Sequence, residues 1–472
     1  MESTKGFIIS INNMDPCPGA DVTSLTSDVA QFYAGKSIFI TGGTGFLGKV
    51  LLEKLLYSCA DIVKIYLLVR DKMGVQANQR LDKLFEKPLF SRIKQERPDV
   101  LKKVVLISGD LTSPNLGINS RDVQILIDKV SVFIHSAATV KFNEVLSMTL
   151  KVNVDGTKEA LNLAQRMKNM QLFVYVSTAY SHTQEPVLKE IAYPPPVQLK
   201  EEYEFAMQHY MQHHEEVEND LTTFLRGHPN TYTFTKALAE NYVIQNHRDV
   251  PVIIVRPSIV SASFNEPVAG WVDNWYGATA ILSGIVKGLI RVLYSRCDVI
   301  LDLIPLDYVS NLIIVATAKS KRSNRIIFYN CCSSWANPIT MAELFKHITI
   351  YASKHEMSTY PTLHFTIRKW LFSSLQFLLQ TCPAQIADLW LRIIGRKTRY
   401  VKICSQVRAV CKTLEFFTSN SWEMQCQNTR NLHSSLSESD QRIFPCDPKT
   451  INWNEYMVKY FDGIFKYLLK ET

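Results

Sequence analysis

A tyrosine and a lysine four residues apart, Tyr232 and Lys236 in NTYTFTKALAE, have the clearest potential for chemistry. On a helix, residues at this spacing share one face and lie one turn apart. A tyrosine phenol has an ordinary pKa of about 10, and a neighbouring ammonium would move that pKa toward neutrality by stabilising the phenolate. Such pairs also occur by chance, so proton transfer is predicted only if the surroundings supply a reaction partner.

A further hydroxyl is expected where the apolar run in LFVYVSTAY ends, because Ser177 and Thr178 follow a predicted strand there. Such a hydroxyl could donate a hydrogen bond to a substrate carbonyl. Together with Tyr232 it would stabilise the oxyanion that develops as hydride arrives. We favour Thr178, with Ser177 as the alternative, since the Ser177 hydroxyl could equally bond to local backbone.

Three glycines, Gly42, Gly45 and Gly48 in SIFITGGTGFLGKVLL, separate a strand-like run from a helical pattern. At such a corner the backbone can turn tightly, approach a pyrophosphate and pack the helix on the sheet. A structural turn could look similar, but the position between strand and helix predicts dinucleotide binding. The expected loop consists of Thr41, Gly42, Gly43, Thr44, Gly45, Phe46, Leu47 and Gly48.

The second apolar run, KIYLLVR, ends in Arg70, and Asp71 and Lys72 follow it. An NAD site usually places a carboxylate here for the ribose hydroxyls, whereas a guanidinium suits a 2′-phosphate. The sequence therefore favours NADPH with Arg70 at its phosphate. Because Asp71 is a carboxylate, NADH stays an alternative, and Arg70 could also be an ordinary surface charge.

Small and polar residues follow the next two apolar runs, where a cofactor would cross the edge of the sheet. Asp110 and Leu111 in GDL could contact the adenine. Ala137 in HSAATV would leave space for the cofactor, although Ala137 and Ala138 could simply pack tightly. Asn153 in NVDGT is expected to open the following helix.

These residues need a scaffold that brings the ends of several strands together. From residue 36 onward, short apolar runs alternate with helical patterns; the runs are SIFIT, KIYLLV, KVVLIS, VSVFIH, LFVYVS and PVIIVR. Strands that are apolar on both faces are typical of a parallel sheet covered by helices on both sides. The sequence predicts a doubly wound α/β domain at residues 34–350, a flexible leader at 1–33 and a smaller, mainly helical domain at 351–472.

Composition narrows the possible partners and the compartment. A net charge of +8 over 472 residues permits anionic ligands or a membrane surface, and no basic motif interleaved with aromatic residues indicates nucleic acid. Ten cysteines without C-x-x-C spacing indicate reduced thiols in an intracellular protein. The first residues, MESTKGFIISINNMDPC, do not read as a secretory signal. His209 and His213 have metal-ligand spacing, but no metal is expected because no further ligands cluster near them.

Together, TGGTGFLG, VSTAY, NVDGT and the tyrosine–lysine pair resemble the extended short-chain dehydrogenase/reductases. A narrower resemblance, to the alcohol-forming fatty acyl-CoA reductases, rests on HSAATVKF, KEIAYPPP, VIIVRPSIV, EPVAGWVDNWYGATAILSGIVKGLIRV, DLIPLDYV, YNCCSSWANPIT and LEFFTSNSWEMQCQNT. It extends to NWNEYMVKYFDGIFKYLLKE and so covers nearly the whole chain after residue 34.

This resemblance implies the reduction of a long-chain acyl-CoA to a fatty alcohol by two equivalents of NADPH, through an aldehyde. Tyr232 would be the proton donor, and Lys236 would tune it and hold the nicotinamide ribose. Thr178 or Ser177 would orient the carbonyl, and Asn153 would support a water-mediated proton relay. A sugar-nucleotide or sterol reductase or epimerase is a rival, as is a non-catalytic lipid-binding relative. The helical C-terminal part argues against the first, and the complete set of hydroxyls and lysine argues against the second.

Membrane contact is expected at residues 370–394, WLFSSLQFLLQTCPAQIADLWLRII. Polar residues and a proline interrupt this stretch, so a clean transmembrane helix is not expected. An interfacial hairpin backed by the basic run IGRKTRYVK is the sharper prediction, and a buried hairpin is the alternative. The expected location is intracellular, at the cytosolic face of a peroxisomal or endoplasmic reticulum membrane. The sequence identifies no protein partner.

Overall fold

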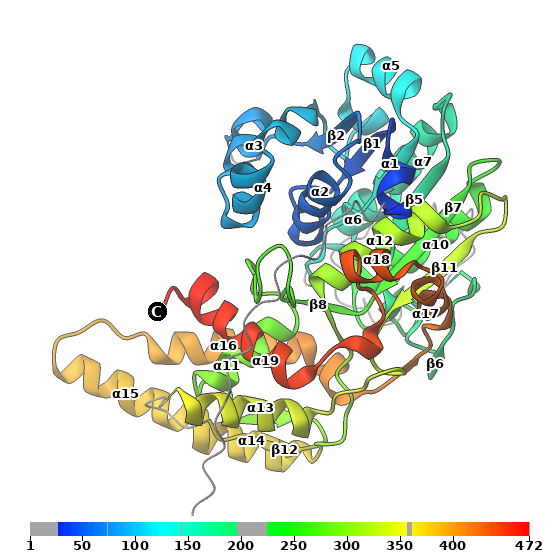
Figure 1. Ribbon diagram of the computed structural model, residues 1–472. Coiled ribbons are helices and arrows are strands. Elements are labelled where there is room, and N and C mark those ends of the chain that lie inside the picture. Colours follow the sequence, from blue (N-terminus) through cyan, green and yellow to red (C-terminus); the bar gives the residue numbers. More distant parts are fainter. Residues whose placement is uncertain (1–26, 73, 143, 196–223, 356–360, 472) are drawn as a thin grey trace, which may run out of the picture.

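A computed structural model of the chain, shown in Figure 1, describes residues 27–72, 74–142, 144–195, 224–355 and 361–471. His209 and His213 lie outside these ranges, so the expectation that they bind no metal stays a prediction.

Residues 28–33, expected to belong to a flexible leader, form the helix α1 (Asp28–Tyr33). Val29 and Tyr33 are fully buried in the main core. The Tyr33 hydroxyl donates a hydrogen bond of 2.8 Å to the carbonyl of Ile314. The leader prediction is therefore wrong for these six residues, because their apolar side chains pack against the folded domain.

The centre of the protein is a parallel sheet of seven strands. The strands are β1 (Ser37–Thr41), β2 (Lys64–Val69), β3 (Val104–Ser108), β4 (Val132–His135), β5 (Leu172–Val176), β7 (Val252–Pro257) and β11 (Ile327–Cys331), in the spatial order β3-β2-β1-β4-β5-β7-β11. All six predicted runs are strands of this sheet, and β11 adds a seventh strand that is not among those runs. The doubly wound α/β prediction is confirmed. The strand order reverses between β1 and β4, which is where ligands bind in such sheets.

Helices cover both faces of the sheet because its strands are apolar on both sides. Ile38 and Ile40 of β1 join one core, and Phe39 between them joins the other. The first core includes residues of α2 (Phe46–Ser58) and α12 (Leu306–Lys319); the second includes residues of α5 (Ser120–Lys129), α7 (Gly156–Arg166) and α10 (Thr231–Asn246).

Shorter elements surround this sandwich. The helices are α3 (Ala77–Phe85), α4 (Ser91–Glu96), α6 (Leu146–Leu150), α11 (Ala278–Val286) and α13 (Met341–Lys354). Three two-stranded parallel pairs join β8 (Ile259–Ser261) to β10 (Leu303–Pro305), β9 (Val292–Tyr294) to β12 (His364–Thr366), and β6 (Val187–Leu188) to β13 (Glu423–Met424).

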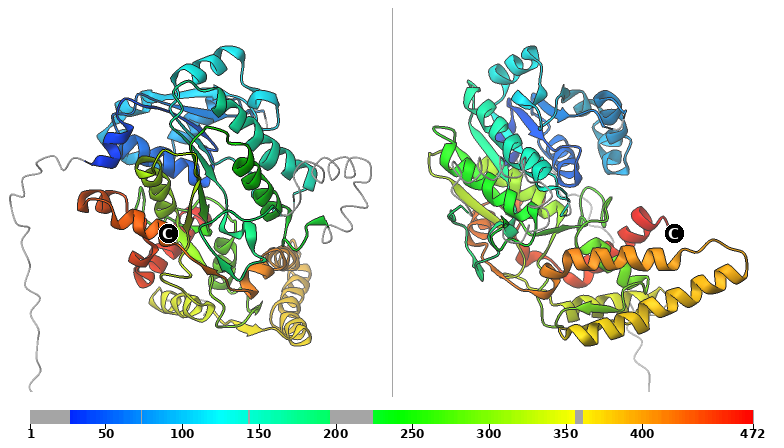
Figure 2. Two further views of the ribbon diagram at one scale, coloured as in Figure 1. Left: turned by 90° about the vertical axis from the view of Figure 1, so that its right-hand side faces the viewer. Right: turned by 180° about the vertical axis from the view of Figure 1, so that it is seen from behind.

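The C-terminal part is mainly helical, as predicted. Its helices are α14 (Lys369–Gln376), α15 (Cys382–Ile393), α16 (Tyr400–Ser419), α17 (Gln427–Ser434), α18 (Glu438–Ile443) and α19 (Trp453–Gly463), with π-helical turns at Phe377–Thr381 and Ile464–Leu469. Residues 370–394 were expected to form a hairpin by themselves, but α14, the π-helical turn and α15 follow one another without a break. They form one arm of a long hairpin, whose other arm is α16 and which extends beyond the rest of the protein in Figures 1 and 2.

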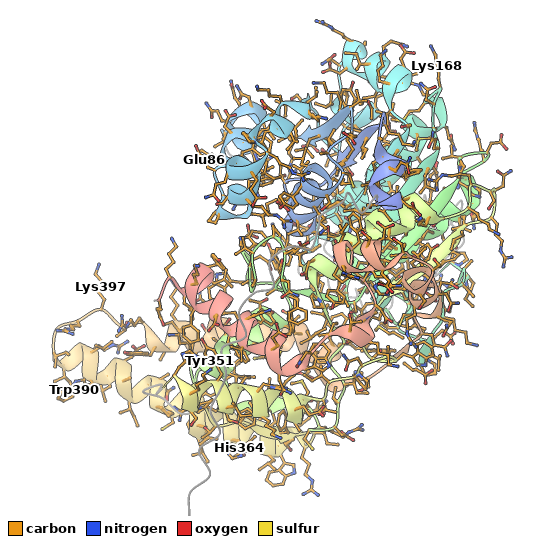
Figure 3. The ribbon with its side chains drawn as sticks, in the orientation of Figure 1. Glu86, Lys168, Tyr351, His364, Trp390 and Lys397 are labelled. Carbon is orange, nitrogen blue, oxygen red and sulfur yellow. The ribbon has the colours of Figure 1, made fainter. Side chains whose placement is uncertain are left out.

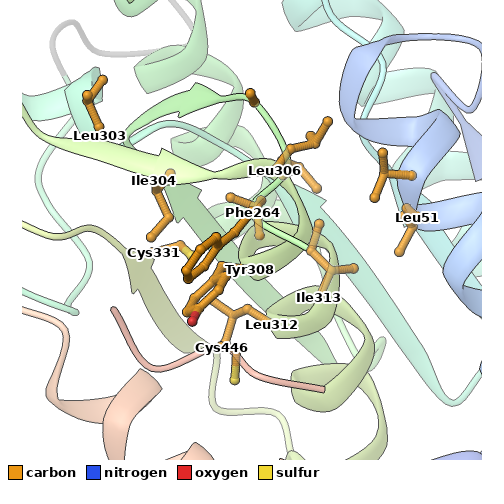
Figure 4. Close-up of a cluster of buried hydrophobic side chains, with 14 of the residues drawn as sticks. Leu51, Phe264, Leu303, Ile304, Leu306, Tyr308, Leu312, Ile313, Cys331 and Cys446 are labelled. Carbon is orange, nitrogen blue, oxygen red and sulfur yellow. The ribbon is translucent and has the colours of Figure 1, made fainter. Parts of the chain in front are cut away.

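The C-terminal part shares its core with the sheet domain. In Figure 4, the rings of Phe264 and Tyr308 lie face to face, with centroids 6.3 Å apart, and Cys446 of the C-terminal part lies among the same apolar side chains. Tyr456 of α19 is fully buried, and its hydroxyl lies 2.6 Å from that of Ser261. The two parts are therefore joined by a continuous apolar core.

Candidate active site

Helix α10 carries Tyr232 and Lys236 along one face of the sheet. Its first turn is capped by Asn230, whose side chain accepts a hydrogen bond of 2.9 Å from the backbone N–H of Thr233. The cap fixes the start of the helix, so Tyr232 lies in its first turn and Lys236 one turn later. Both thus face the end of β5.

Lys236 is almost fully buried at the end of β5. Its Nζ donates a hydrogen bond of 2.5 Å to the carbonyl of Val176 and lies 4.2 Å from the centroid of the Tyr175 ring. Burial lowers the pKa of Lys236 to about 7, and the negative charge of Glu240 opposes this shift. The ammonium is therefore anchored to the strand rather than to the phenol.

The structure differs here from the expected effect of Lys236 on Tyr232. Burial raises the pKa of Tyr232 to about 12, and a hydrogen bond with the Thr178 side chain opposes that shift. Lys236 points to Val176 and does not lower the pKa of Tyr232. The phenol is therefore protonated at neutral pH, which is the state that a proton donor requires.

Of the two candidate hydroxyls, Thr178 is the one that the structure brings to Tyr232. Its Oγ1 also accepts a hydrogen bond of 3.3 Å from the N–H of Tyr180 and so caps the 3-10 turn Ala179–His182. The Ser177 hydroxyl is buried and has no hydrogen-bond partner among the described residues. The alternative interpretation, in which the Ser177 hydroxyl bonds to local backbone, is therefore not what these residues show.

Asn153 connects the loop after β4 to the catalytic helix. It sits in a π-helical turn, Lys151–Asp155, where its Oδ1 accepts from the N–H of Thr139 at 2.9 Å. Its Nδ2 donates to the Thr139 carbonyl at 3.2 Å and to Oγ1 of Thr235 at 3.0 Å. With both ends of its amide bound, Asn153 fixes the distance between this loop and α10.

The glycine corner has the geometry of an anion cradle. Gly42 has φ +78°, and a Cβ there would lie 2.7 Å from the backbone N of Ala137. A Cβ on Gly48 would lie 2.2 Å from the carbonyl oxygen of Gly42. Within the described ranges, no side chain caps α2, whose N-cap is Gly45. The free N–H groups of its first turn fit a pyrophosphate, and a dinucleotide therefore fits these residues.

The neighbours of this corner are tightly packed. Thr41 Oγ1 lies 2.8 Å from Nδ1 of His135, so this hydroxyl forms a side-chain hydrogen bond between β1 and β4. Burial and the charge of Lys236 lower the pKa of His135 to about 3, so the ring is neutral. Ala137 is buried and lies against Gly42, so it does pack tightly, as the alternative interpretation of this residue expected. Phe46 stacks on Trp271 with ring centroids 5.7 Å apart.

The remaining predicted cofactor residues differ in their surroundings. Thr44 is partly buried in the corner, and Leu47 is partly buried against the main core. Gly43 faces Leu67, whose Cδ1 leaves no space for a Cβ. Leu111 lies against Gly156 of α7.

A pair of arginines lies at the end of β2. Arg70, about half exposed, has its Nη1 3.7 Å from Oδ2 of Asp110. Arg80 of α3 donates through Nη1 to the carbonyl of Arg70 and through Nη2 to Oγ1 of Thr44 at 3.4 Å. Burial and the charge of Arg70 lower the pKa of Arg80. Two guanidinium groups therefore converge beside the glycine corner.

The carboxylates near these arginines already have partners. Asp71 Oδ1 accepts a hydrogen bond of 2.8 Å from the N–H of Ala77 and so caps α3. Asp110 Oδ1 accepts from the N–H and the hydroxyl of Thr112, at 2.9 and 2.8 Å. Each carboxylate therefore has one oxygen engaged by a neighbouring backbone N–H.

Sequence reasoning missed a buried ion network behind Lys236. Glu240, one turn further along α10 and fully buried, accepts from Nη2 and Nε of Arg256 at 2.6 and 3.1 Å. His182 Nε2 lies 3.1 Å from the same carboxylate. The spacing of Tyr232, Lys236 and Glu240 was a usable signal, because all three share one helix face.

An aromatic cluster lies beside Tyr232, and the sequence did not predict it. Its ring lies 5.8 Å from that of Phe142, which lies 5.4 Å from Phe417 near the end of α16. Tyr180 lies 5.0 Å from Phe417 on its other side. The C-terminal part thus contributes an apolar wall to the site.

Comparisons with known proteins agree with this arrangement. Two family models, both described as male sterility protein, match residues 40–313 and 379–471. Among solved structures, the terminal reductase domain of the myxalamid biosynthetic pathway superposes with a TM-score of 0.62 at 20% identity, covering 92% of each chain. A reductase domain of a nonribosomal peptide synthetase from Mycobacterium tuberculosis gives a TM-score of 0.60 at 16% identity, covering 93% of this chain and 94% of that one. These structures share the fold.

Curated relatives are similar over nearly the whole chain. Fatty acyl-CoA reductase 1 of Xenopus laevis is 38% identical and that of Homo sapiens 36% identical, each match covering 94% of this chain and 86% of the relative. Fatty acyl-CoA reductase wat of Drosophila melanogaster is 35% identical with the same coverage. With its extended short-chain dehydrogenase sheet and tyrosine–lysine helix, the chain belongs to the fatty acyl-CoA reductase family.

Proposed function

We propose that the protein reduces a long-chain fatty acyl-CoA to the fatty alcohol, with NADPH as the hydride donor. The observation that carries the proposal is the contact of a protonated Tyr232 with Thr178, at the sheet edge where the glycine corner opens. A proton donor, a second hydroxyl and a dinucleotide cradle are what carbonyl reduction requires. The names of the relatives, and the apolar wall formed by Phe142 and Phe417, support a fatty acyl substrate.

Each reduction needs a hydride, which NADPH supplies when bound. In the first, Tyr232 donates its proton to the thioester oxygen while Thr178 donates a hydrogen bond to it, and a hemithioacetal forms. Its C–S bond then breaks, CoA leaves as the thiol, and the aldehyde remains. In the second, Tyr232 protonates the aldehyde oxygen and the alcohol forms. Lys236, bound to the Val176 carbonyl, holds α10 against the end of β5 and so positions Tyr232, and Asn153 holds the loop after β4 against the same helix.

The preference for NADPH is supported by the two arginines beside the glycine corner. Burial, and after it the charge of Arg70, lowers the pKa of Arg80, and a 2′-phosphate between the two guanidinium groups would relieve their repulsion. Asp71, the carboxylate that could have favoured NADH, is engaged in capping α3.

Removal of either arginine should weaken NADPH binding selectively. We expect Arg70→Ala and Arg80→Ala each to cost about 1.5–3 kcal/mol in NADPH binding, the range for a hydrogen bond to a charged group, with much less effect on NADH. Calorimetric titration with both dinucleotides measures the difference. Arg121→Ala on α5, an exposed arginine remote from the corner, is the control. Equal losses for both dinucleotides would place the arginines away from the 2′-phosphate.

The proposed reaction is tested by incubating the purified protein with NADPH and acyl-CoAs of several chain lengths. Nucleotide oxidation is followed by absorbance and products by mass spectrometry. We expect two NADPH oxidised and one CoA thiol released for each alcohol formed. An aldehyde as the final product, or oxidation only with a sugar nucleotide or a sterol, would refute the proposal.

A further inference from the structure

The arm of the hairpin that α14 and α15 form exposes an apolar stripe that no other part of the described chain covers. Seven of its large side chains are between 51% and 69% exposed: Trp370, Phe377, Leu378, Ile386, Leu389, Trp390 and Ile393. Asp388 is the only buried residue of α15, and α14 has none. Large apolar side chains gathered in this way mark an interaction surface.

The stripe is continuous because of the π-helical turn at Phe377–Thr381. An α-helix turns about 100° per residue, so Ile386 would point about 160° away from Trp370. A π turn holds one extra residue, which returns Ile386 to within roughly 60° of Trp370. The turn thus aligns the apolar residues of α14 and α15 on one face. This is the face on which the exposed apolar side chains lie.

Basic residues flank the stripe at both ends. Residues 368–412 contain nine lysines and arginines and one acidic residue, a net charge of +8, which equals the net charge of the entire chain. Arg368 and Lys369 precede the stripe, and Arg392, Arg396, Lys397, Arg399 and Lys402 gather at its far end. All seven are exposed, and Asp388, the single carboxylate of this segment, attracts Arg392 and Arg399. With nine cationic residues and one carboxylate, the segment gives the apolar surface a cationic border.

The tip of the hairpin has a fixed shape. Asp388 accepts hydrogen bonds of 2.9 Å from the backbone N–H groups of Arg399, Tyr400 and Val401, so it caps α16 from α15. Figure 3 shows Trp390 on the helix and Lys397 on the tip loop, both far from the sheet domain. The apolar and basic side chains are thus presented together on a preformed element.

We infer that this hairpin is a peripheral docking element for an anionic lipid bilayer. Its stripe lies at the boundary between headgroups and acyl chains, and its basic border contacts the headgroup phosphates and carboxylates. No helix within the described ranges is long and apolar enough to cross a bilayer. A second copy of this chain is a poorer occupant, because it would bring the same +8 segment against this one. This inference rests on exposure and charge, independently of the proposed substrate.

Sedimentation of the full chain with vesicles tests the inference. We expect binding to phosphatidylcholine vesicles containing phosphatidylserine, little binding to phosphatidylcholine alone, and release at high salt. Arg396→Gln with Lys397→Gln should weaken binding roughly 25-fold, at about fivefold per charge. Leu389→Ser with Trp390→Ser should weaken it by at least about tenfold. The matched controls are Arg121→Gln with Lys129→Gln on α5 and Ile350→Ser on α13, all exposed, and they should bind normally.

Quenching of tryptophan fluorescence by bromine-labelled acyl chains reports the depth of the stripe. We expect quenching in the wild type and its loss in the double variant Trp370→Phe and Trp390→Phe, which retains the other five tryptophans. Equal vesicle binding by hairpin and control variants would overturn the inference. So would attachment that survives an alkaline carbonate wash, or a dimer that the Leu389→Ser, Trp390→Ser variant dissociates while vesicle binding is absent.

Discussion

Tyr232→Phe should lower turnover of acyl-CoA by a factor on the order of 10² to 10⁴, the contribution of a positioned proton donor. The change removes one hydroxyl and keeps the ring, which packs 5.8 Å from that of Phe142. NADPH affinity should be nearly unchanged, because the glycine corner and the two arginines are untouched. Steady-state kinetics together with a dinucleotide titration separate these effects.

The matched control is Tyr242→Phe, which removes a hydroxyl from the same helix ten residues further on. Tyr242 lies outside the aromatic cluster, with its ring beside Lys158 at 5.6 Å. Its variant should retain wild-type turnover. If the Tyr232 variant kept most of its activity, another group would have to protonate the substrate oxygen and the assigned mechanism would be wrong.

The sequence predicted the sheet and the residues at its edge because both depend on local patterns. Each apolar run formed a strand, and the residues that follow each run came to the carboxyl end of the sheet. Parallel strands bring these ends together wherever they lie in the chain. Thr178 and Tyr232 could therefore be paired before the fold was known.

Contacts between segments far apart in sequence could not be predicted in this way. Arg256 pairs with Glu240 across two elements, and Phe417 reaches the aromatic cluster from the C-terminal part. Nothing in the local pattern of either residue indicates its partner. The pKa of Tyr232 was missed for a related reason, because it depends on burial and on where the Lys236 ammonium points, which three-dimensional packing decides.

Glu240→Gln should lower the free energy of unfolding by about 3–5 kcal/mol, the range for breaking a buried ion pair by removing one partner. The variant keeps the shape of the side chain but leaves the guanidinium of Arg256, which is 2% exposed, without its counter-charge. Because Arg256 also donates to the carbonyls of Lys189 and Ile191, we expect this segment to loosen first. Urea unfolding followed by circular dichroism measures the loss.

The contribution of Glu240 should also depend on pH. Burial alone would raise its pKa, but Arg256 and His182 outweigh burial and hold the pKa well below its ordinary value of 4.5. Because the folded-state pKa is lowered, the stabilisation is fully present above about pH 4.5 and is lost as the pH falls toward the folded-state value. The difference between wild type and Glu240→Gln should therefore shrink in acid.

A surface pair supplies the comparison for this variant. Glu438 and Arg442 lie one turn apart with a 3.1 Å contact, but their side chains are 89% and 73% exposed. Solvent screens such a pair, so Glu438→Gln should change the free energy of unfolding by less than about 1 kcal/mol. If the two variants lost similar stability, Glu240 would not be acting as the counter-charge of a desolvated arginine, and the helix that carries Tyr232 and Lys236 would be held without it.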